Sequence, residues 1–430
     1  MFKYIQPYLS RRVYPLLLLG LASGLPLSLT GGTLQAWATV EKVSLQEIGF
    51  LTLVGAAYTF KFFWAPFLDR YAPPFLGQRR GWMFISQIAL GLAICGMGLL
   101  NPSQYLFYLA LVATLVAFLS ATQDIAFDAY SAEVLRQEER AAGAAIRTLG
   151  YRIGMIVSGG LALWMAERWL GWNSMYMLMG GLMFVAAFLT VLAPEPENSQ
   201  QQKPRTVYEA FTLPFQEFFS RKGAWMILLL IVLYKLGDAF AGALSTTFLI
   251  RGAGFGADVV GQVNKILAVV ATIIGALIGG SIMTKLGLYR ALMLFGILQA
   301  VSNLAYAVVA LFPQNLSIMA AAVGFENICG GLGTAAFVAL LMALSNQRFT
   351  ATQFALLSAL SSVGRVFMAG PITPVLVQQF GWANFFVITM FIAVPGLILL
   401  WWRKRDIIAL EPESTPEEKS ESEATTAPSA

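Results

Sequence analysis

Histidine is absent from the 430-residue sequence, and cysteine occurs only twice. Histidine is the one side chain whose unperturbed pKa lies near neutral pH, so any proton relay in this chain must use carboxyl groups. Cys95 and Cys329 both lie in apolar runs, and no second cysteine or histidine stands at the spacing of a zinc ligand. We therefore expect neither a metal site nor a cofactor.

Charged residues are also scarce. They make up 12% of the chain, whereas soluble domains carry about 25%. Apolar residues make up 57% and the mean hydropathy is +0.68, which leaves too little polar surface to cover a water-soluble globule. The basic residues are scattered over short loops, which argues against nucleic-acid binding. The composition therefore predicts a polytopic membrane protein surrounded by the lipid bilayer.

Apolar runs long enough to cross a bilayer as helices, which takes about 20 residues each, occur throughout the chain. We predict twelve spans, centred near residues 25, 57, 91, 117, 155 and 183 in the first half and 237, 270, 301, 331, 365 and 392 in the second. Their grouping predicts an N-terminal six-helix bundle (1–193), a central cytoplasmic loop (194–223), a C-terminal six-helix bundle (224–402) and a cytoplasmic tail (403–430). The tail is acidic and rich in Ser, Thr and Pro, so we expect it to be disordered.

The basic residues of the loops predict the orientation of the chain. One set of loops carries most of the lysines and arginines, and the other set holds only Lys42, Arg168 and Arg251. Because positively charged loops stay in the cytoplasm, we expect both termini to be cytoplasmic.

The two halves of the chain also resemble each other at an offset of roughly 210 residues. Gly171-Trp172 opens the sixth predicted span and Gly381-Trp382 opens the twelfth. Arg152 in the fifth span corresponds to Arg365 in the eleventh. This repetition predicts two pseudo-symmetric six-helix bundles, the arrangement of parallel-repeat transporters.

Ionisable residues lie inside the predicted spans or at their inner ends, where each would cost about 2.5–3.5 kcal/mol if it faced lipid. Ten such costs exceed the roughly 5–15 kcal/mol by which a typical fold is stable, so these residues must face one another or a water-filled cavity. The third, sixth, ninth and twelfth spans carry none, and we expect those four helices to face lipid. The ten residues are Lys61, Asp124, Asp128, Arg147, Arg152, Lys235, Asp238, Lys265, Glu326 and Arg365.

Two of the buried carboxyl groups, Asp124 and Asp128, stand one helical turn apart and share a helix face. We expect them to face Lys61, Arg147 and Arg152. Structural ion pairs near the cytoplasmic end of the helix would explain both aspartates. A protonatable carboxyl group that changes its cation partner would explain them equally, because a nearby cation lowers the pKa of a carboxyl group and its loss raises it.

The second half carries a similar set. Lys235 and Asp238 are three residues apart and can pair with each other on one helix face. Glu326, beside Asn327, is expected to pair with Arg365 across neighbouring helices. Six of the ten internal charges are cations, which favours a ligand with carboxylates or phosphates. The candidate proton-coupling residues are Asp124, Asp128, Asp238 and Glu326.

Neutral polar residues inside the spans are further candidates for ligand contacts. The hydrogen-bonding candidates could hold sugar hydroxyls or amides, and Trp37 could stack on a sugar ring. Hydrogen bonds between helices and an interfacial aromatic belt are the alternative explanations. The hydrogen-bonding candidates are Gln35, Tyr58, Gln123, Tyr151, Asn264, Asn303 and Asn327.

Several long segments closely resemble AmpG-type muropeptide permeases of the major facilitator superfamily. They include "LLLGLASGLPLSLTGGTLQAW", "KFFWAPFLDRY", "ATQDIAFDAY" and "FENICGGLGTAAFVALLM", and the resemblance runs from about residue 10 to about residue 402. One departure concerns the loop between the second and third spans, where an insertion separates Asp69-Arg70 from Arg79-Arg80. The gating role of that loop in the superfamily therefore carries over only loosely.

The resemblance implies an all-α membrane protein with the major facilitator fold, acting as a monomeric permease and not as an enzyme. It implies proton symport of anhydro-muropeptides, the GlcNAc-anhydroMurNAc peptides of cell-wall turnover, across the inner membrane of a Gram-negative bacterium. Such import serves peptidoglycan recycling and, in some species, β-lactamase induction. The ligand's carboxylates would meet Lys61, Arg152, Lys235, Lys265 and Arg365, and its amine would meet Asp238 or Glu326.

Other functions remain open at this stage. Related branches of the superfamily share the pattern of the second helix, so a carrier of another anionic solute, such as an acyl-CoA or nucleotide-type compound, is the alternative. An intramembrane enzyme would need a convergent nucleophile, base or metal group, and the chain has no histidine to supply one. A purely structural scaffold would not explain ten internal charges confined to eight helices.

Overall fold

The computed structural model describes residues 10–136, 139–194, 212, 216–221, 223–345 and 350–410. Within these residues the regular structure is helical throughout, with no strand. Most of the predicted central loop (194–223) and most of the predicted tail (403–430) lie outside the described residues. The first residues of that tail depart from the predicted disorder, because Lys404–Ile408 form the short helix α21 and bury Ile407.

The first half of the chain supplies six spans. The first consists of α2 and α3, the second is a broken series from α4 to α6, the third and fourth are α7 and α8, the fifth runs from α9 to η6, and the sixth is α11. Their bounds are α2 Pro15–Thr30, α3 Gly32–Val40, α4 Leu45–Leu51, η2 Thr52–Gly55, α5 Ala56–Phe60, η3 Lys61–Phe63, α6 Ala65–Arg70, α7 Gln78–Gly98, α8 Pro102–Val134, α9 Arg140–Ile156, η5 Val157–Leu161, α10 Ala162–Met165, η6 Ala166–Leu170 and α11 Gly171–Leu192.

The second half repeats this plan. The seventh span runs from α13 to η7, the eighth from α15 to α16, the ninth is α17, the tenth is α18, and the eleventh and twelfth run from α19 through α20. Their bounds are α13 Ala224–Ala243, α14 Ser245–Thr247, η7 Phe248–Gly252, α15 Ala257–Val260, η8 Gly261–Leu267, α16 Ala268–Leu286, α17 Leu288–Leu311, α18 Leu316–Leu344, α19 Thr350–Val363, η9 Gly364–Ala369 and α20 Gly370–Trp402.

The apolar helices account for the predicted number of spans. Nine helical segments of the described chain are long and apolar enough to cross a membrane. Two of them, Ala142–Leu192 and Gln353–Trp402, contain 51 and 50 residues, and each holds two spans because the chain turns inside it at Gly171 or Gly381. The broken second span completes the twelve, so the predicted fold class is confirmed.

Glycines with positive φ mark equivalent turns in the two halves. Gly171 and Gly381, at φ 71° and 75°, begin the sixth and twelfth spans, and Gly77 and Gly287, at φ 73° and 77°, precede the third and ninth. Other residues rarely adopt this backbone conformation, which glycine reaches without strain. Positions 77 and 287, and positions 171 and 381, are each 210 residues apart, which supports the predicted internal repeat.

A seam of glycines holds the first and fifth spans together. A Cβ added at Gly150 of α9 would lie 2.2 Å from the carbonyl oxygen of Leu17, and one added at Gly24 of α2 would lie 2.2 Å from that of Tyr151. Gly20 and Gly24, like Gly150 and Gly154, follow the spacing that lets two membrane helices approach closely. This packing fixes the rotation of α9 about its own axis.

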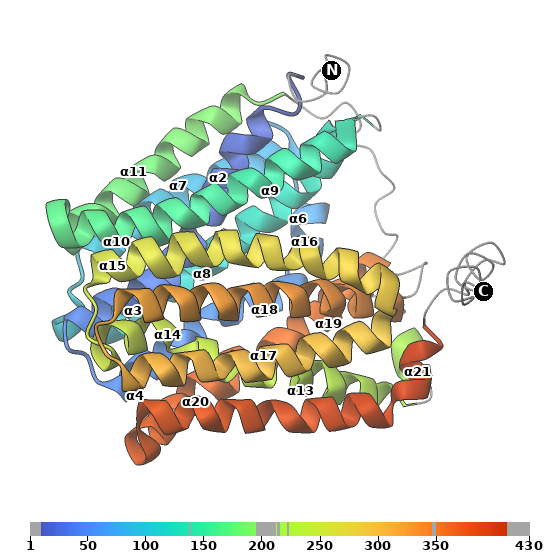
Figure 1. The fold of residues 1–430 in the computed structure, drawn as a ribbon. Helices are drawn as coiled ribbons and strands as arrows, with labels where there is room; N and C mark the ends of the chain where they lie inside the picture. The colour runs from blue at the N-terminus through green and yellow to red at the C-terminus, as the bar shows by residue number, and fades with distance from the viewer. Residues whose placement is uncertain are drawn as a thin grey trace, which may run out of the picture.

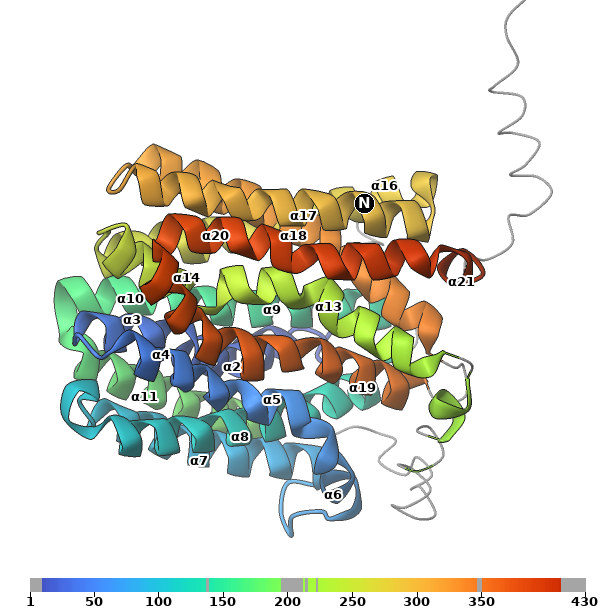
Figure 2. The ribbon, with the colours of Figure 1, turned by 90° about the horizontal axis from the view of Figure 1, so that it is seen from below.

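The two bundles meet most closely at the end away from the chain termini, and we call this the closed end. Arg168 of η6 forms an ion pair with Asp258 of α15, with Nη2 and Oδ2 2.7 Å apart. The hydroxyls of Thr39 and Thr247 lie 3.0 Å apart, and Arg251 donates to the Thr39 carbonyl oxygen at 3.0 Å. In Figure 1 the bundles approach on the left and diverge toward the right, where α21 lies. Figure 2 shows α4 and α5 beside α19 and the first part of α20.

Candidate functional site

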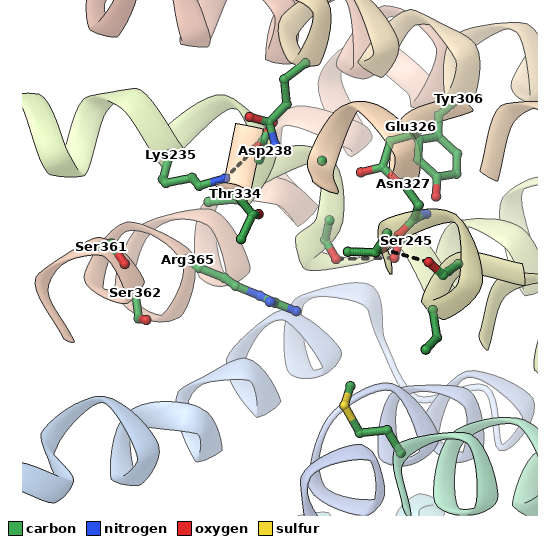
Figure 3. A pocket seen from close by; sticks show the side chains of 18 of the residues that line it. Lys235, Asp238, Ser245, Tyr306, Glu326, Asn327, Thr334, Ser361, Ser362 and Arg365 are labelled. Atoms are coloured by element: carbon green, nitrogen blue, oxygen red, sulfur yellow. Dashed lines mark hydrogen bonds and ion pairs between the residues drawn. The ribbon is translucent and has the colours of Figure 1, made fainter. Parts of the chain in front are cut away.

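A cavity of about 500 Å³ lies between the two bundles. Its size is within the roughly 300–1,000 Å³ of small-molecule sites. Most of its wall comes from the second half of the chain, and Ser28, Arg152 and Met155 contribute from the first half. Its charged lining residues are Arg152, Lys235, Asp238, Glu326 and Arg365. Five of the ten predicted internal charges therefore surround one space, and Figure 3 shows the four that come from the second half.

The anions of this charged cavity already have partners. Lys235 Nζ lies 3.3 Å from Asp238 Oδ2. These two residues of α13 therefore form the ion pair that their spacing in the sequence allowed. Glu326 accepts a hydrogen bond of 2.7 Å from Asn327 Nδ2, and the Tyr306 ring lies beside it (Figure 3). The predicted ion pair between Glu326 and Arg365 is not formed, although both residues line the cavity.

Two cations of the charged cavity have no such partner. Arg365 makes no hydrogen bond or ion pair with any described residue, and its side chain extends away from its own helix toward the first-half helices (Figure 3). Arg152 of α9 likewise makes none within the described chain. Two guanidinium groups, one from each bundle, are thus available to a ligand.

Wide helical turns occur where the chain lines this region. Arg365 lies in η9, a π-helical turn that begins at Gly364, and η8 is another of the chain's π-helical turns. Such turns are rare in helices and occur often at functional sites. Asn264 and Lys265 belong to η8, but their side chains lie outside the described part of the structure, so their predicted roles stay predictions.

A second cavity, of about 410 Å³, adjoins the first. The two share Ser28, Met155, Gly242, Ser245, Ser362 and Arg365. Gln35 and Tyr58, both predicted ligand contacts, line this second space. Gln35 also donates a hydrogen bond of 2.8 Å to the Ala243 carbonyl oxygen across the bundle interface.

The two aspartates of α8 have different partners. Asp128 forms an ion pair with Arg147, and Lys61 Nζ lies 3.9 Å from its other oxygen. Asp124 is only 8% exposed and accepts a hydrogen bond from the Ser23 hydroxyl, with no ion pair to a described residue. Neither aspartate lines either cavity. Arg152, predicted to face them, lines the charged cavity instead.

Several other predicted ligand contacts lie elsewhere in the fold. Trp37 is fully buried and packs on Trp172 and Tyr176, with ring centroids 6.1 and 5.1 Å away. Its face of α3 turns toward α11, which corrects the prediction that it stacks on a sugar. Gln123 and Asn303 are buried and Tyr151 is half-buried, and none of these three lines either cavity.

Several hydroxyl and amide groups line the charged cavity without having been predicted as ligand contacts from the sequence. Ser361 and Ser362 precede Arg365 by about one turn, so their hydroxyls lie near its face of the helix, and that spacing was a visible signal. Gln299 and Tyr306 belong to the ninth span, which was expected to face only lipid. Helices α7 and α11, the third and sixth spans, agree with the expectation that they face lipid. Both line neither cavity, and they expose large apolar side chains such as Leu92 and Phe188.

A family model and curated relatives agree with this architecture. The model of the Major Facilitator Superfamily matches residues 16–322 and 237–429. The chain belongs to the Major Facilitator Superfamily. It is 56% identical over 398 residues to the anhydromuropeptide permease of Escherichia coli strain K12, covering 93% of this chain and 81% of that protein. It is 30% identical over 408 residues to the putative transporter AmpG 4 of Rickettsia felis, covering 92% and 97%. The predicted resemblance to AmpG-type permeases is confirmed.

Solved structures share the fold at low sequence identity. A bacterial homolog of the human lysosomal transporter Spinster, in an inward-facing and unoccupied conformation, has a TM-score of 0.71 at 14% identity, covering 94% of this chain and 97% of that one. The nucleoside transporter NupG has a TM-score of 0.70 at 13% identity, covering 90% and 98%. At these identities the likeness establishes the fold only. Fold and family together make this chain a multi-pass membrane transporter.

Proposed function

We propose that the protein is a proton-coupled secondary transporter that imports anhydro-muropeptides from the periplasm into the cytoplasm. The observation that carries this proposal is its 56% identity, over nearly the whole chain, to a permease named for that substrate. The transporter acts as a monomer in the inner membrane and has no enzymatic role. The excess of lysine and arginine in one set of loops supports cytoplasmic termini.

The chemistry of the charged cavity supports this substrate. A muropeptide offers several carboxylates, an amine, amides and sugar hydroxyls. Arg152 and Arg365 are free to receive carboxylates, and the Glu326 carboxyl group can accept hydrogen bonds from an amine. Lys235 is held by Asp238 and contributes a carboxylate contact only if that pair opens.

The closed end gives the transport cycle a direction. With the termini in the cytoplasm, the closed end faces the periplasm. Admitting a muropeptide from the periplasm requires the contacts of the closed end, such as Arg168–Asp258 and Thr39–Thr247, to separate. Rocking of the two bundles about the site would do this.

Asp124 is the strongest candidate for proton coupling. It is buried and bonded to Ser23, while Asp128, one turn away, holds both Arg147 and Lys61. The protonation of a buried carboxyl group depends on which cation is near it. A rearrangement that moved Lys61 or Arg147 from one aspartate to the other would therefore bind or release a proton at Asp124. Asp238 and Glu326 are the other candidates.

The experiment is uptake of labelled anhydro-muropeptide into inside-negative proteoliposomes, with and without an inward proton gradient. We expect the gradient to stimulate uptake by the wild type. We expect Asp124→Asn to lose that stimulation and to keep counterflow, which needs no net proton movement. Gln87→Leu, a buried polar change on α7 away from both cavities, is the matched control and should keep the stimulation.

Each contrary result has a definite meaning. Stimulation that persists in Asp124→Asn would make this aspartate a packing partner of Ser23 and would move attention to Glu326 and Asp238. Absence of uptake by the wild type would contradict muropeptide import itself, and counterflow with acyl-CoA or nucleotide-type compounds would then be measured.

A further inference from the structure

The two adjoining cavities differ sharply in charge. Among the described residues, five charged side chains line the first cavity and only one, Arg365, lines the second, and Arg365 belongs to both. The second, which we call the neutral cavity, presents hydroxyl and amide groups beside an apolar wall of Leu27, Leu51 and Val366. Its hydroxyl and amide groups, apart from those it shares with the charged cavity, belong to Thr30, Gln35, Thr52, Tyr58, Thr59 and Thr246.

The two linings suit different parts of one ligand. Neutral hydroxyls and amides beside apolar carbon can pair with the hydroxyls, amides and C–H faces of a sugar, and they require no charge from the ligand. A lining with unpaired guanidinium groups and a buried carboxylate suits a peptide with several carboxylates and an amine, because each ligand charge then meets an opposite one.

We propose that the transporter holds its substrate in two subsites, the sugars in the neutral cavity and the peptide in the charged cavity. This rests on the proposed function, which supplies a ligand with one neutral and one charged part. Arg365, at the junction of the two cavities, receives one peptide carboxylate. Arg152 receives a peptide carboxylate from the opposite bundle, and Glu326 receives the amine.

Gly242 marks the passage between the subsites. It lines both cavities, and a Cβ added there would meet no atom of a described residue within 4 Å outside its own helix. A larger side chain at this position would enter the shared space without disturbing the packing of α13. It would therefore obstruct a ligand that extends through both subsites.

The test measures binding of three ligands to the purified full-length protein in lipid nanodiscs. The first is the complete anhydro-muropeptide, the second has its peptide carboxylates amidated, and the third, the sugar-truncated ligand, is the peptide without either sugar. We expect Arg152→Gln to weaken binding of the complete and sugar-truncated ligands by about 10- to 100-fold, and of the amidated ligand by less than about twofold. We expect Tyr58→Phe to weaken the complete and amidated ligands by about two- to tenfold and to leave the sugar-truncated ligand unchanged.

A steric pair of variants adds a second readout. We expect Gly242→Leu to weaken the complete ligand at least about tenfold. Gly181→Leu is the matched control, because a Cβ at Gly181 also meets nothing within 4 Å and α11 lines neither cavity. It should bind like the wild type.

The possible failures are distinguishable. A wild-type protein that does not bind the complete muropeptide would refute the proposed function, and the subsites with it. If the wild type binds, then two results would overturn the subsites alone. One is that Arg152→Gln or Tyr58→Phe affects all three ligands alike, and the other is that Gly242→Leu binds the complete ligand normally.

Discussion

The ion pair between Arg168 and Asp258 should set the balance between the closed and open forms of the closed end. Two guanidinium nitrogens of Arg168 lie 2.7 and 2.8 Å from one carboxylate oxygen of Asp258. The Asp258 side chain is 8% exposed and that of Arg168 is 65% exposed. A hydrogen bond to a charged group contributes about 1.5–3 kcal/mol, and solvent around the exposed guanidinium reduces this to about 1 kcal/mol. Removing the pair should therefore shift the closed-to-open ratio by about fivefold.

The assay is the distribution of distances between spin labels on the two bundles. Leu99 and Leu311 are exposed at the closed end of α7 and α17 and can carry the labels as cysteines. The native Cys95 and Cys329 must first be replaced by serine. In Asp258→Asn we expect a larger fraction of molecules with the longer separation.

The two partners should not be equivalent, and this asymmetry tests the reasoning. Asp258→Asn leaves an exposed Arg168 that water can solvate, whereas Arg168→Gln leaves a buried carboxylate without its cation. The shift should therefore be larger in Arg168→Gln. Asp406→Asn removes an ion pair within one bundle and is the matched control. A distance distribution that is the same in all variants, or a larger shift in Asp258→Asn, would refute the argument.

Two further predictions concern packing and the free cations. Gly150→Ala and Gly275→Ala each place a Cβ 2.2 Å from a backbone oxygen of the neighbouring helix, so each should destabilise the protein by about 1–3 kcal/mol and lower its melting temperature in detergent. Gly181→Ala, with no neighbour within 4 Å, should not, and equal melting temperatures would contradict the glycine seams. Arg365→Gln should leave the melting temperature unchanged, because Arg365 makes no hydrogen bond or ion pair with any described residue, and it should reduce muropeptide uptake. A large loss of stability would show that Arg365 supports the fold instead.

The sequence predicted the number of spans because each apolar run is an intrinsic property of its own segment. The rotation of each helix about its axis depends on its neighbours, and there prediction was weaker. Arg152 was expected to face the aspartates of α8. It lies midway between Gly150 and Gly154, and at 100° per residue it is about 200° round from Gly150. Because the glycines face α2, Arg152 must point to the other side, into the charged cavity.

The same reasoning explains the two aspartates. Asp124 and Asp128 share one face of α8, as their spacing predicted, but they lie at different depths. At one depth the facing residue is Ser23 of α2, and at the other it is Arg147 of α9. Depth along a neighbouring helix is set by loop lengths and tilt, which the sequence of α8 does not contain. The partners of Asp124 and Asp128 could therefore be identified only from the structure.

The internal repeat has a consequence for the ligand. Arg152 and Arg365 occupy corresponding positions in the fifth and eleventh spans, and both line the charged cavity from opposite bundles. Two like charges that face one space repel each other unless anions lie between them. A ligand with two carboxylates can neutralise both guanidinium groups, whereas a ligand with one leaves a cation unpaired when the cavity closes.

Loss of one peptide carboxylate should therefore slow uptake more than loss of a neutral group of similar size. The defect should be smaller in Arg152→Gln, which has one cation fewer to neutralise. Uptake of singly amidated and unmodified muropeptides by the wild type and by Arg152→Gln measures both effects in one experiment. If amidation slows the two proteins by the same factor, the two arginines do not act on the ligand together, and the charge of the cavity serves only to attract it.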